Sequence, residues 1–581
     1  MVKISKDICS KVSLFIGVLA FVIFVAYVLY INQEVLYTAH SRSEFLYGSP
    51  FFHALMSKPF GLIQYVGAWL TQLFYYPALG AAVLVIIWTL IIMVGIKAFR
   101  LNGSASALML LPVACLLTSV VDLGYWIYIS IIRGYWFSQS VGYLLFVVLL
   151  WGARYTPRKW HLAWYVFAVC LYPVLGWFAM LFLICLALSE KLTWREFIGV
   201  VLLIFMPGIW RVLLYSNLNV NDVMLAGMPR FATAGDITPR LTTPFWILGA
   251  VSVFIALCGK FLVKWYVPVL CSIAGIVFTS SFMFSDKNYF DEMRMVRYAE
   301  DDNWKEVLKI AEEASSPTSS MVMLKNTALM YEGGLLDRAF KTTNDAIPIS
   351  PIDSLHVSFL EVASPLVYFS YGLTNESIRL SYECAVQASF SPFYLKQLSR
   401  CALAKGDKKL LERYTTILHH HPFYTDWQPT PAPAKTSELM RCFPDEITGV
   451  ENSDSYIVNS ISLWYETDSK LVSEQALFFS MLRRDTKRFW PSLRNYAKLH
   501  LKENFPLHAQ EAYIMYMDKA PEVKRIMLPV EQKVYDRYKQ FWAILEEFAN
   551  SGMSKEECAN KMRQRFGDTY WYFNVFAKRI Y

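Results

Sequence analysis

Carboxylates are scarce in the first half of this sequence. Up to residue 285 the chain has 8 Asp and Glu against 18 Lys and Arg, whereas the remainder has 39 against 37. The formal net charge of +8 therefore originates in the first half, and the second half is close to neutral. Because a nucleic-acid-binding surface normally gives the soluble part of a protein a basic excess, this distribution argues against binding of nucleic acid.

Motifs of soluble enzymes and of metal sites are also missing. The sequence has no P-loop, no dinucleotide-binding glycine motif after a strand, no nucleophile elbow and no zinc-protease helix motif. Its ten cysteines show no CxxC spacing, so we predict no metal site. Three consecutive histidines precede Pro422, and neighbouring side chains on a helix point in different directions. We interpret His419, His420 and His421 as a basic helix end.

Apolar runs of membrane-spanning length fill the first half. A helix that crosses the hydrocarbon core of a bilayer needs about 20 residues. Runs of roughly this length cover residues 12–31, 78–99, 104–121, 134–151, 197–215, 244–258 and 265–284. A longer run at 160–189 is interrupted by Tyr172, Pro173 and Gly176, so it forms either one kinked helix or two short helices.

The positions of Lys and Arg favour two crossings in segment 160–189. Cytoplasmic loops carry most of the Lys and Arg of membrane proteins, and nine spans place the basic loops on the side of the N-terminus. The second half then lies outside the cytoplasm, whereas a single crossing would leave it inside. We therefore predict an all-α protein with an N-terminal polytopic transmembrane bundle of about nine spans at residues 1–285.

The second half changes to amphipathic segments of helix length with short turns. The expected helix starts lie 32 to 38 residues apart, at Asn303, Leu335, Leu373 and Asp407. Paired helices that recur at about 34 residues are the signature of tetratricopeptide (TPR) repeats, which stack into a solenoid with a concave binding face. We predict a soluble TPR-like α-solenoid at 286–423, a Pro-rich linker at 424–455 and a C-terminal helical block at 456–581.

Charged residues stand in the outer loops of the nine-span topology. The carboxylates of interest are Glu34, Glu44 and Asp122, and the arginines are Arg42, Arg133, Arg230 and Arg240. An amphipathic segment, 51–77, follows in the first outer loop. This layout resembles that of GT-C-type glycosyltransferases, which are polytopic enzymes with an acidic residue in the first outer loop. The resemblance stops at the layout, because no Asp-x-Asp or Asp-Asp pair follows the first span.

The GT-C resemblance implies roles for these residues. The carboxylates of Glu34, Glu44 and Asp122 would be catalytic and take a proton from the acceptor. The four arginines would bind the phosphate of a polyprenyl-phosphate-linked sugar donor, and a divalent cation is a possible cofactor. The alternative is that these side chains are solvated loop residues, as most loop carboxylates are.

Four stretches resemble an uncharacterised family of bacterial polytopic membrane proteins with a TPR-like second half: LFYYPALG, KGDKKLLERY, FPLHAQEAY and FGDTYWYF. The resemblance implies a multi-pass protein of the bacterial inner membrane, with a cytoplasmic N-terminus and a periplasmic C-terminal domain. We expect that domain to bind a protein, a peptide or an envelope component as a scaffold or assembly factor. The alternative is the GT-C-like transferase. A transporter is less favoured because the spans contain almost no charged residues.

Overall fold

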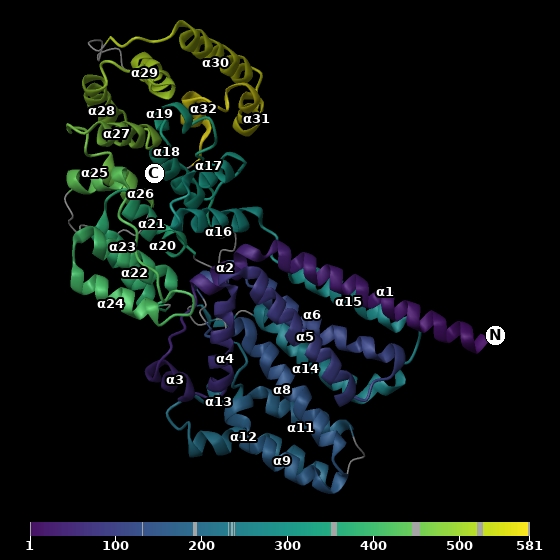
Figure 1. Cartoon of the computed structure of the whole chain (residues 1–581). Helices are drawn as coiled ribbons and strands as arrows, with labels where there is room; N and C mark the ends of the chain where they lie inside the picture. The colour runs from purple at the N-terminus through teal and green to yellow at the C-terminus, as the bar shows by residue number, and fades with distance from the viewer. Residues whose placement is uncertain are drawn as a thin grey trace. The chain divides into compact units, whose positions relative to one another are not determined.

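The computed structural model describes residues 2–129, 132–189, 194–229, 232–233, 236–237, 239–349, 357–387, 389–443, 454–519 and 527–578. Its regular structure is almost entirely helical (Figure 1), which confirms the predicted all-α class. The two strands of the described part, β1 (Ala232–Thr233) and β2 (Asp236–Ile237), form one antiparallel pair.

Contacts divide the chain into two compact units. Unit 1 comprises Met1–Asp286 together with two short segments of the second half, Ala388–Phe393 and Thr416–Trp427. Unit 2 comprises the rest of the second half: Lys287–Gln387, Tyr394–Thr415 and Gln428–Tyr581. The chain therefore passes between the two units five times.

Unit 1 contains the helices that could cross a membrane. Among the described residues, five helices are long and apolar enough: α1 (Val2–Ile31) from Ile8 onward, α5 (Pro77–Ala98), η2 with α6 (Gly103–Met109 and Leu110–Val121), α8 (Tyr135–Tyr155) and α14 (Pro239–Cys258). A sixth is added if α15 (Val267–Phe282) and the following α16 (Lys287–Glu300), with which unit 2 begins, form one bent span. Several apolar helices of this length are what a multi-pass membrane protein requires.

This number is smaller than the nine predicted spans because several predicted runs form shorter helices. Segment 160–189 breaks into α9 (His161–Cys170), α10 (Tyr172–Leu175) and α11 (Trp177–Ser189), and Gly176 adopts a left-handed φ of 55° at the last break. The 13 residues of α11 rise only about 20 Å. In α12 (Trp194–Leu213), only Phe197–Leu213 is apolar, with Pro207 inside it.

The apolar helices of unit 1 differ in how much of their surface is covered. The α6 helix is buried almost completely, and it packs against α14 and α15. The α1, α5, α12 and α15 helices instead expose large apolar side chains, among them Phe15, Ile86, Phe205 and Val277. Exposed apolar faces on such long helices fit contact with lipid chains.

The second half is a succession of helices. After α16 these are α17 (Trp304–Glu312), α18 (Ser319–Glu332), α19 (Leu335–Arg338), α20 (Phe359–Val362), α21 (Ser364–Ser370), α22 (Thr374–Gln387), α23 (Pro392–Lys405), α24 (Lys408–His419), α25 (Ala434–Cys442), α26 (Asp454–Ile461), α27 (Lys470–Leu482), α28 (Thr486–Leu499), α29 (Leu507–Lys519), α30 (Gln532–Asn550), α31 (Lys555–Phe566) and α32 (Tyr570–Phe576). Four of them begin at, or one residue after, the predicted starts: α17, α19, α22 and α24.

The predicted alternation of paired helices is interrupted at the second repeat. The α19 helix is a single turn, and the described chain after it, up to Ile349, is not helical. The Ile347 amide donates to the Pro317 carbonyl (3.0 Å), and the Ile347 carbonyl accepts from the Ser319 amide (3.3 Å). An extended segment thus stands where a TPR repeat has its second helix.

The Pro-rich segment 424–455, predicted as a linker, contains helix α25. Three prolines, ending with Pro433, stand directly before the helix, and none lies in the helix itself. Thr436 of α25 is buried in unit 2 and donates to the carbonyl of Ser370 (3.0 Å). Part of the predicted linker is therefore packed, and residues 444–453 lie outside the described part of the chain.

Candidate functional site

The first loop of unit 1 brings together residues singled out in the sequence. After α1 it forms α2 (Gln33–Ser41), α3 (Ser49–Met56), α4 (Gly61–Thr71) and η1 (Gln72–Tyr75). Glu34 lies in the first turn of α2, and Arg42 follows the end of that helix. The amphipathic segment predicted at 51–77 is thus largely helical.

Two predicted catalytic carboxylates are paired with two predicted phosphate-binding arginines. Arg133 Nη2 donates to Glu44 Oε2 at 2.9 Å, and Arg240 Nη2 lies 3.3 Å from Asp122 Oδ1. Arg230 lies outside the described residues. The carboxylate–arginine proximity that the transferase hypothesis requires is therefore present twice, while the roles themselves stay predictions.

Asp122 is the most perturbed of these carboxylates. Its side chain is only 2% exposed, directly after the last residue of α6. Burial raises the pKa of Asp122 to about 7, although the positive charge of Arg240 acts in the opposite direction. A carboxyl group with such a pKa exchanges its proton near neutral pH, as a general base must.

Arg42 is held between aromatic rings. Its guanidinium carbon lies 3.5 Å from the centre of the Phe393 ring and 5.3 Å from that of Tyr128, and the residue is 5% exposed. Ser389 donates to its carbonyl (3.3 Å). The cavity beside Arg42 has a volume of about 20 Å³, room for about one water molecule. A lipid phosphate would reach this side chain only if that packing opened.

The histidine-rich stretch is part of the same unit. The α24 helix ends at His419, as the sequence indicated, but His421 is fully buried. Burial lowers the pKa of His421 to about 3, so this ring is neutral rather than basic. Next to it, the Tyr424 hydroxyl and His40 Nε2 are 2.9 Å apart, and Phe423 stacks on Tyr75. These rings join residues 416–427 to the first loop.

Unit 2 contains a cleft with a volume of about 1060 Å³. One wall is formed by residues 314–316 after α17 and by the non-helical chain after α19, residues 340–348. The other wall is formed by α31, the turn at Gly567–Asp568 and the chain around α32. The interruption of the repeat pattern therefore creates one side of this cleft. Sequence reasoning missed the cleft, because its walls lie more than 200 residues apart in the chain.

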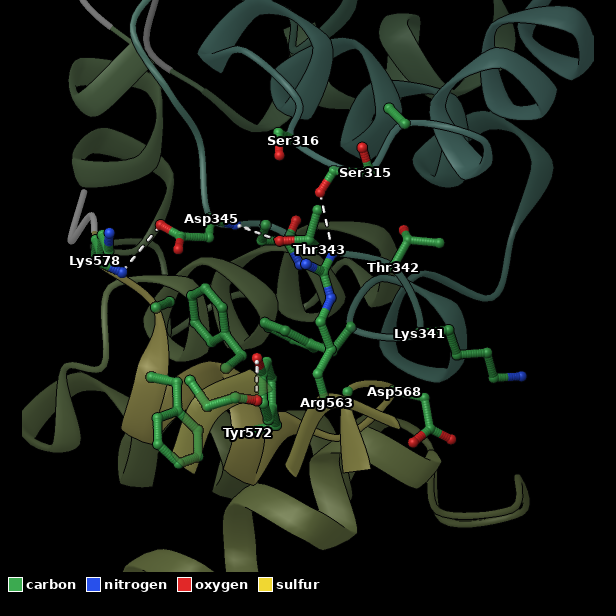
Figure 2. A pocket seen from close by; sticks show the side chains of 18 of the residues that line it. Ser315, Ser316, Lys341, Thr342, Thr343, Asp345, Arg563, Asp568, Tyr572 and Lys578 are labelled. Atoms are coloured by element: carbon green, nitrogen blue, oxygen red, sulfur yellow. Dashed lines mark hydrogen bonds between the residues drawn. The ribbon is translucent and has the colours of Figure 1, made fainter. Parts of the chain in front are cut away.

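Arg563 joins the two walls. Its side chain reaches from α31 through the middle of the cleft, and Nη2 donates to the Ser315 carbonyl at 3.0 Å (Figure 2). At the end of the cleft, the Lys578 amide donates to Asp345 Oδ1 (2.9 Å). The floor includes the rings of Phe340 and Phe573, whose centres are 5.0 Å apart.

The four carboxylates that line the cleft all have partners. Asp568 receives two hydrogen bonds from Arg537 (2.6 and 3.2 Å), and Glu312 receives one from Arg338 (2.8 Å). Glu556 lies 3.8 Å from Lys578 Nζ, and Asp345 accepts from the Lys578 amide. Three of these four carboxylates are therefore in ion pairs, and Asp345 accepts from a backbone amide.

Three cations of the lining have no carboxylate partner within the described ranges: Lys341, Arg563 and Arg565. Among the described residues, Arg563 donates to the Ser315 carbonyl alone, and Arg565 donates to Gln540 Oε1 (3.3 Å). Around them stand the hydroxyl groups of Ser315, Ser316, Thr342 and Thr343. This arrangement offers N–H and O–H donors to an anionic ligand.

A buried lysine supports the wall formed by residues 340–344. Lys325 of α18 is 2% exposed, and its ammonium contacts four oxygens: the carbonyls of Ala339 and Thr343 (both 3.1 Å), Thr342 Oγ1 (3.3 Å) and Asn344 Oδ1 (2.8 Å). Burial lowers the pKa of Lys325 to about 7, and the charge of Glu312 opposes this effect. Lys325 thus fixes the backbone beneath the cleft, a role for which its sequence context gives no signal.

The cleft has the character of a binding site. Among the described residues of the whole chain, no group of three or more His, Cys, Asp or Glu side chains could hold a metal ion. The lining combines aromatic rings, hydroxyl groups and unpaired cations, a combination that positions a ligand by contact and charge.

Comparisons with known proteins give one match. No curated protein and no solved structure matches the chain. Residues 8–577 match a family of unknown function, DUF6057, so the match covers nearly the whole of both units. The chain, with its apolar helices and its cleft-bearing helical unit, therefore belongs to this family of unknown function.

Proposed function

We propose that this protein is a membrane-anchored binding protein whose unit 2 cleft holds a segment of a partner protein. The apolar helices of unit 1 supply the anchor, and we place it in the bacterial inner membrane with unit 2 on the periplasmic side. The protein would thereby act as a scaffold or assembly factor of the envelope.

The cleft is the observation that carries this proposal. It combines a large volume with an aromatic floor and with cations that the protein itself leaves without carboxylate partners. Sites for ligands are typically concave, with apolar walls and a few polar groups that set orientation. We therefore place ligand binding between residues 340–348, where the predicted repeat pattern is interrupted, and the C-terminal helices. The concave face of a regular solenoid is not needed for this function.

Photo-crosslinking in cells tests the proposal. A photoreactive amino acid replaces Asn560, which is exposed in the cleft, or Lys561, the next residue on α31, which does not line it. We expect a discrete crosslinked protein at position 560 alone, lost when Arg563→Glu is added. The same products at both positions, or no product at 560, would contradict the proposal.

A second candidate function, a GT-C-like glycosyltransferase, is favoured by Asp122. A buried carboxyl group with a pKa of about 7 beside Arg240 fits a base next to a phosphate-binding cation. Cells that lack the protein should then lose one envelope glycoconjugate, and Asp122→Asn should fail to restore it although the variant is inserted and folded. Restoration by Asp122→Asn, or an unchanged set of glycoconjugates, would exclude this candidate.

A further inference from the structure

The cleft of unit 2 allows an inference about the chemistry of its ligand, which rests on the proposed binding function. We propose that it binds an extended acidic peptide segment, whose carboxylates meet Arg563, Arg565 and Lys341 and whose main chain lies along residues 342–348.

The charges of the lining select an acidic ligand. Three of its four carboxylates are in ion pairs, so a basic ligand that meets them would have to displace Arg537 from Asp568 or Lys578 from Glu556. An acidic ligand displaces no ion pair and gains charge-assisted hydrogen bonds from Arg563. The guanidinium group has five N–H donors, and within the described ranges one of them is used, on the Ser315 carbonyl.

The backbone of the wall formed by residues 340–348 favours a peptide as the ligand. The chain turns at residues 339–342 and then runs to the bridge at Ile347, and within the described part of the chain the amides of Asn344 and Ala346 make no hydrogen bond to another backbone group. In an extended chain, consecutive amides point to opposite edges. The Ile347 amide is directed at Pro317, so the Ala346 amide points away from that pairing. Unpaired main-chain groups along an extended edge are the groups that an added peptide strand pairs with.

The floor of the cleft adds apolar contact. Phe340, Phe573 and Phe576 line it together with Tyr572, whose hydroxyl donates to the Ala559 carbonyl (3.1 Å). The three phenylalanine side chains are 1, 5 and 8% exposed, so they offer a ligand a small area of apolar contact. The volume of about 1060 Å³ lies at the upper end for ligand sites, which suits several peptide residues rather than one small metabolite.

The test uses the full-length protein in lipid nanodiscs. A random 12-residue peptide library is selected against it, with the Arg563→Ala protein as the counter-selection, and polygalacturonate serves as an anionic polysaccharide probe. We expect enriched peptides with an excess of Asp and Glu. Their affinity should fall about tenfold when these residues become Asn and Gln, since hydrogen bonds to charged groups contribute about that much.

Variants of the protein locate the interaction. Arg563→Ala and Lys341→Met should each weaken the acidic peptides about tenfold or less, and both side chains are exposed, so folding should be retained. Arg413→Ala removes an exposed arginine of α24 that does not line the cleft, and affinity should stay within about twofold.

The remaining outcomes overturn the inference in distinguishable ways. Enriched peptides without an acidic excess would show that the ligand is not an acidic peptide, while the proposed binding function would stand. Binding of polygalacturonate in place of any peptide would assign the cleft to a glycan. No binding of either probe, with a crosslinked protein at position 560, would again reject only the ligand class. No binding together with no crosslink would reject both proposals.

Discussion

Arg42 in unit 1 and Arg563 in unit 2 carry the same guanidinium group in opposite settings. Arg42 is buried against the rings of Phe393 and Tyr128, whereas Arg563 is exposed in a cleft and donates one hydrogen bond. A buried guanidinium on aromatic rings holds segments of the fold together, while an exposed one with free donors is available to a ligand. Position in a cleft, rather than residue type, separates the two roles.

Arg42→Ala should have the largest effect on stability. It removes the cation from the Phe393 and Tyr128 rings and leaves a cavity in a buried site, so we expect unit 1 to lose about 3 kcal/mol of unfolding free energy. Thermal unfolding in detergent measures this loss. Arg42→Lys should restore part of the stability, because it keeps the charge without the planar group. Unchanged unfolding of the alanine variant would refute the structural role.

Lys325 and Lys341 of unit 2 allow the same comparison between a buried and an exposed cation. Lys325→Met leaves four oxygen acceptors without their donor, so we expect a loss of about 2 kcal/mol and a disordered cleft wall. Lys341→Met, in the cleft, should change stability by less than about 0.5 kcal/mol. Chemical denaturation of both variants checks the difference. Equal losses would mean that Lys341 also supports the fold.

Asp122→Asn should change how unit 1 responds to pH. The pKa of Asp122 is raised to about 7 from an ordinary 3.8, so the folded state holds this proton more tightly than the unfolded state. Its stabilising contribution is therefore present below about pH 4 and is lost as pH rises to about 7. At pH 8 the variant should be more stable than the natural protein by on the order of 1 kcal/mol, and at pH 4 the gain should vanish.

Unfolding temperatures at the two pH values measure this effect. Glu44→Gln is the matched control, because Glu44 is also paired with an arginine and should show no comparable gain at pH 8. A lower stability of Asp122→Asn at pH 8 would show that the ion pair with Arg240 outweighs the burial of the charge.

Arg133→Gln should have the smallest effect. The Arg133 side chain is 40% exposed, and an ion pair at such a site contributes less than about 1 kcal/mol. Its effect on unfolding should shrink further at 1 M salt, where charges are screened within about 3 Å. A loss as large as that of Arg42→Ala would remove the distinction between buried and exposed arginines.

The sequence predicted the helical class and the starts of several helices, because turn residues and amphipathic spacing are local signals. Gly406–Asp407 before α24 and Asn303 before α17 are examples. It overestimated the number of spans: Pro173 and Gly176 marked the break in segment 160–189, but the prediction counted two crossings where the helices have only 10 and 13 residues.

The candidate sites were predictable only in part. The nine-span prediction placed Glu44, Arg133, Asp122 and Arg240 in loops on the same side. In the structure, Arg133 pairs with Glu44 and Arg240 pairs with Asp122. It gave no indication that Arg563 would meet Ser315, since 248 residues separate them. Nor did it show that Phe393 would cover Arg42, because such contacts depend on the tertiary fold and leave no local pattern.

The packing of residues 389–393 and 416–427 into unit 1 has a consequence for biosynthesis. The rings of Phe393, Phe423 and Tyr424 cover Arg42, His40 and Tyr75, yet they are translated more than 300 residues later. At a translation rate of about 5 to 20 residues per second, the first loop stays uncovered for roughly 20 to 70 s. A chain that ends before residue 389 would keep this aromatic surface exposed. A chaperone would then bind it, or a protease would degrade it, as an incompletely folded chain.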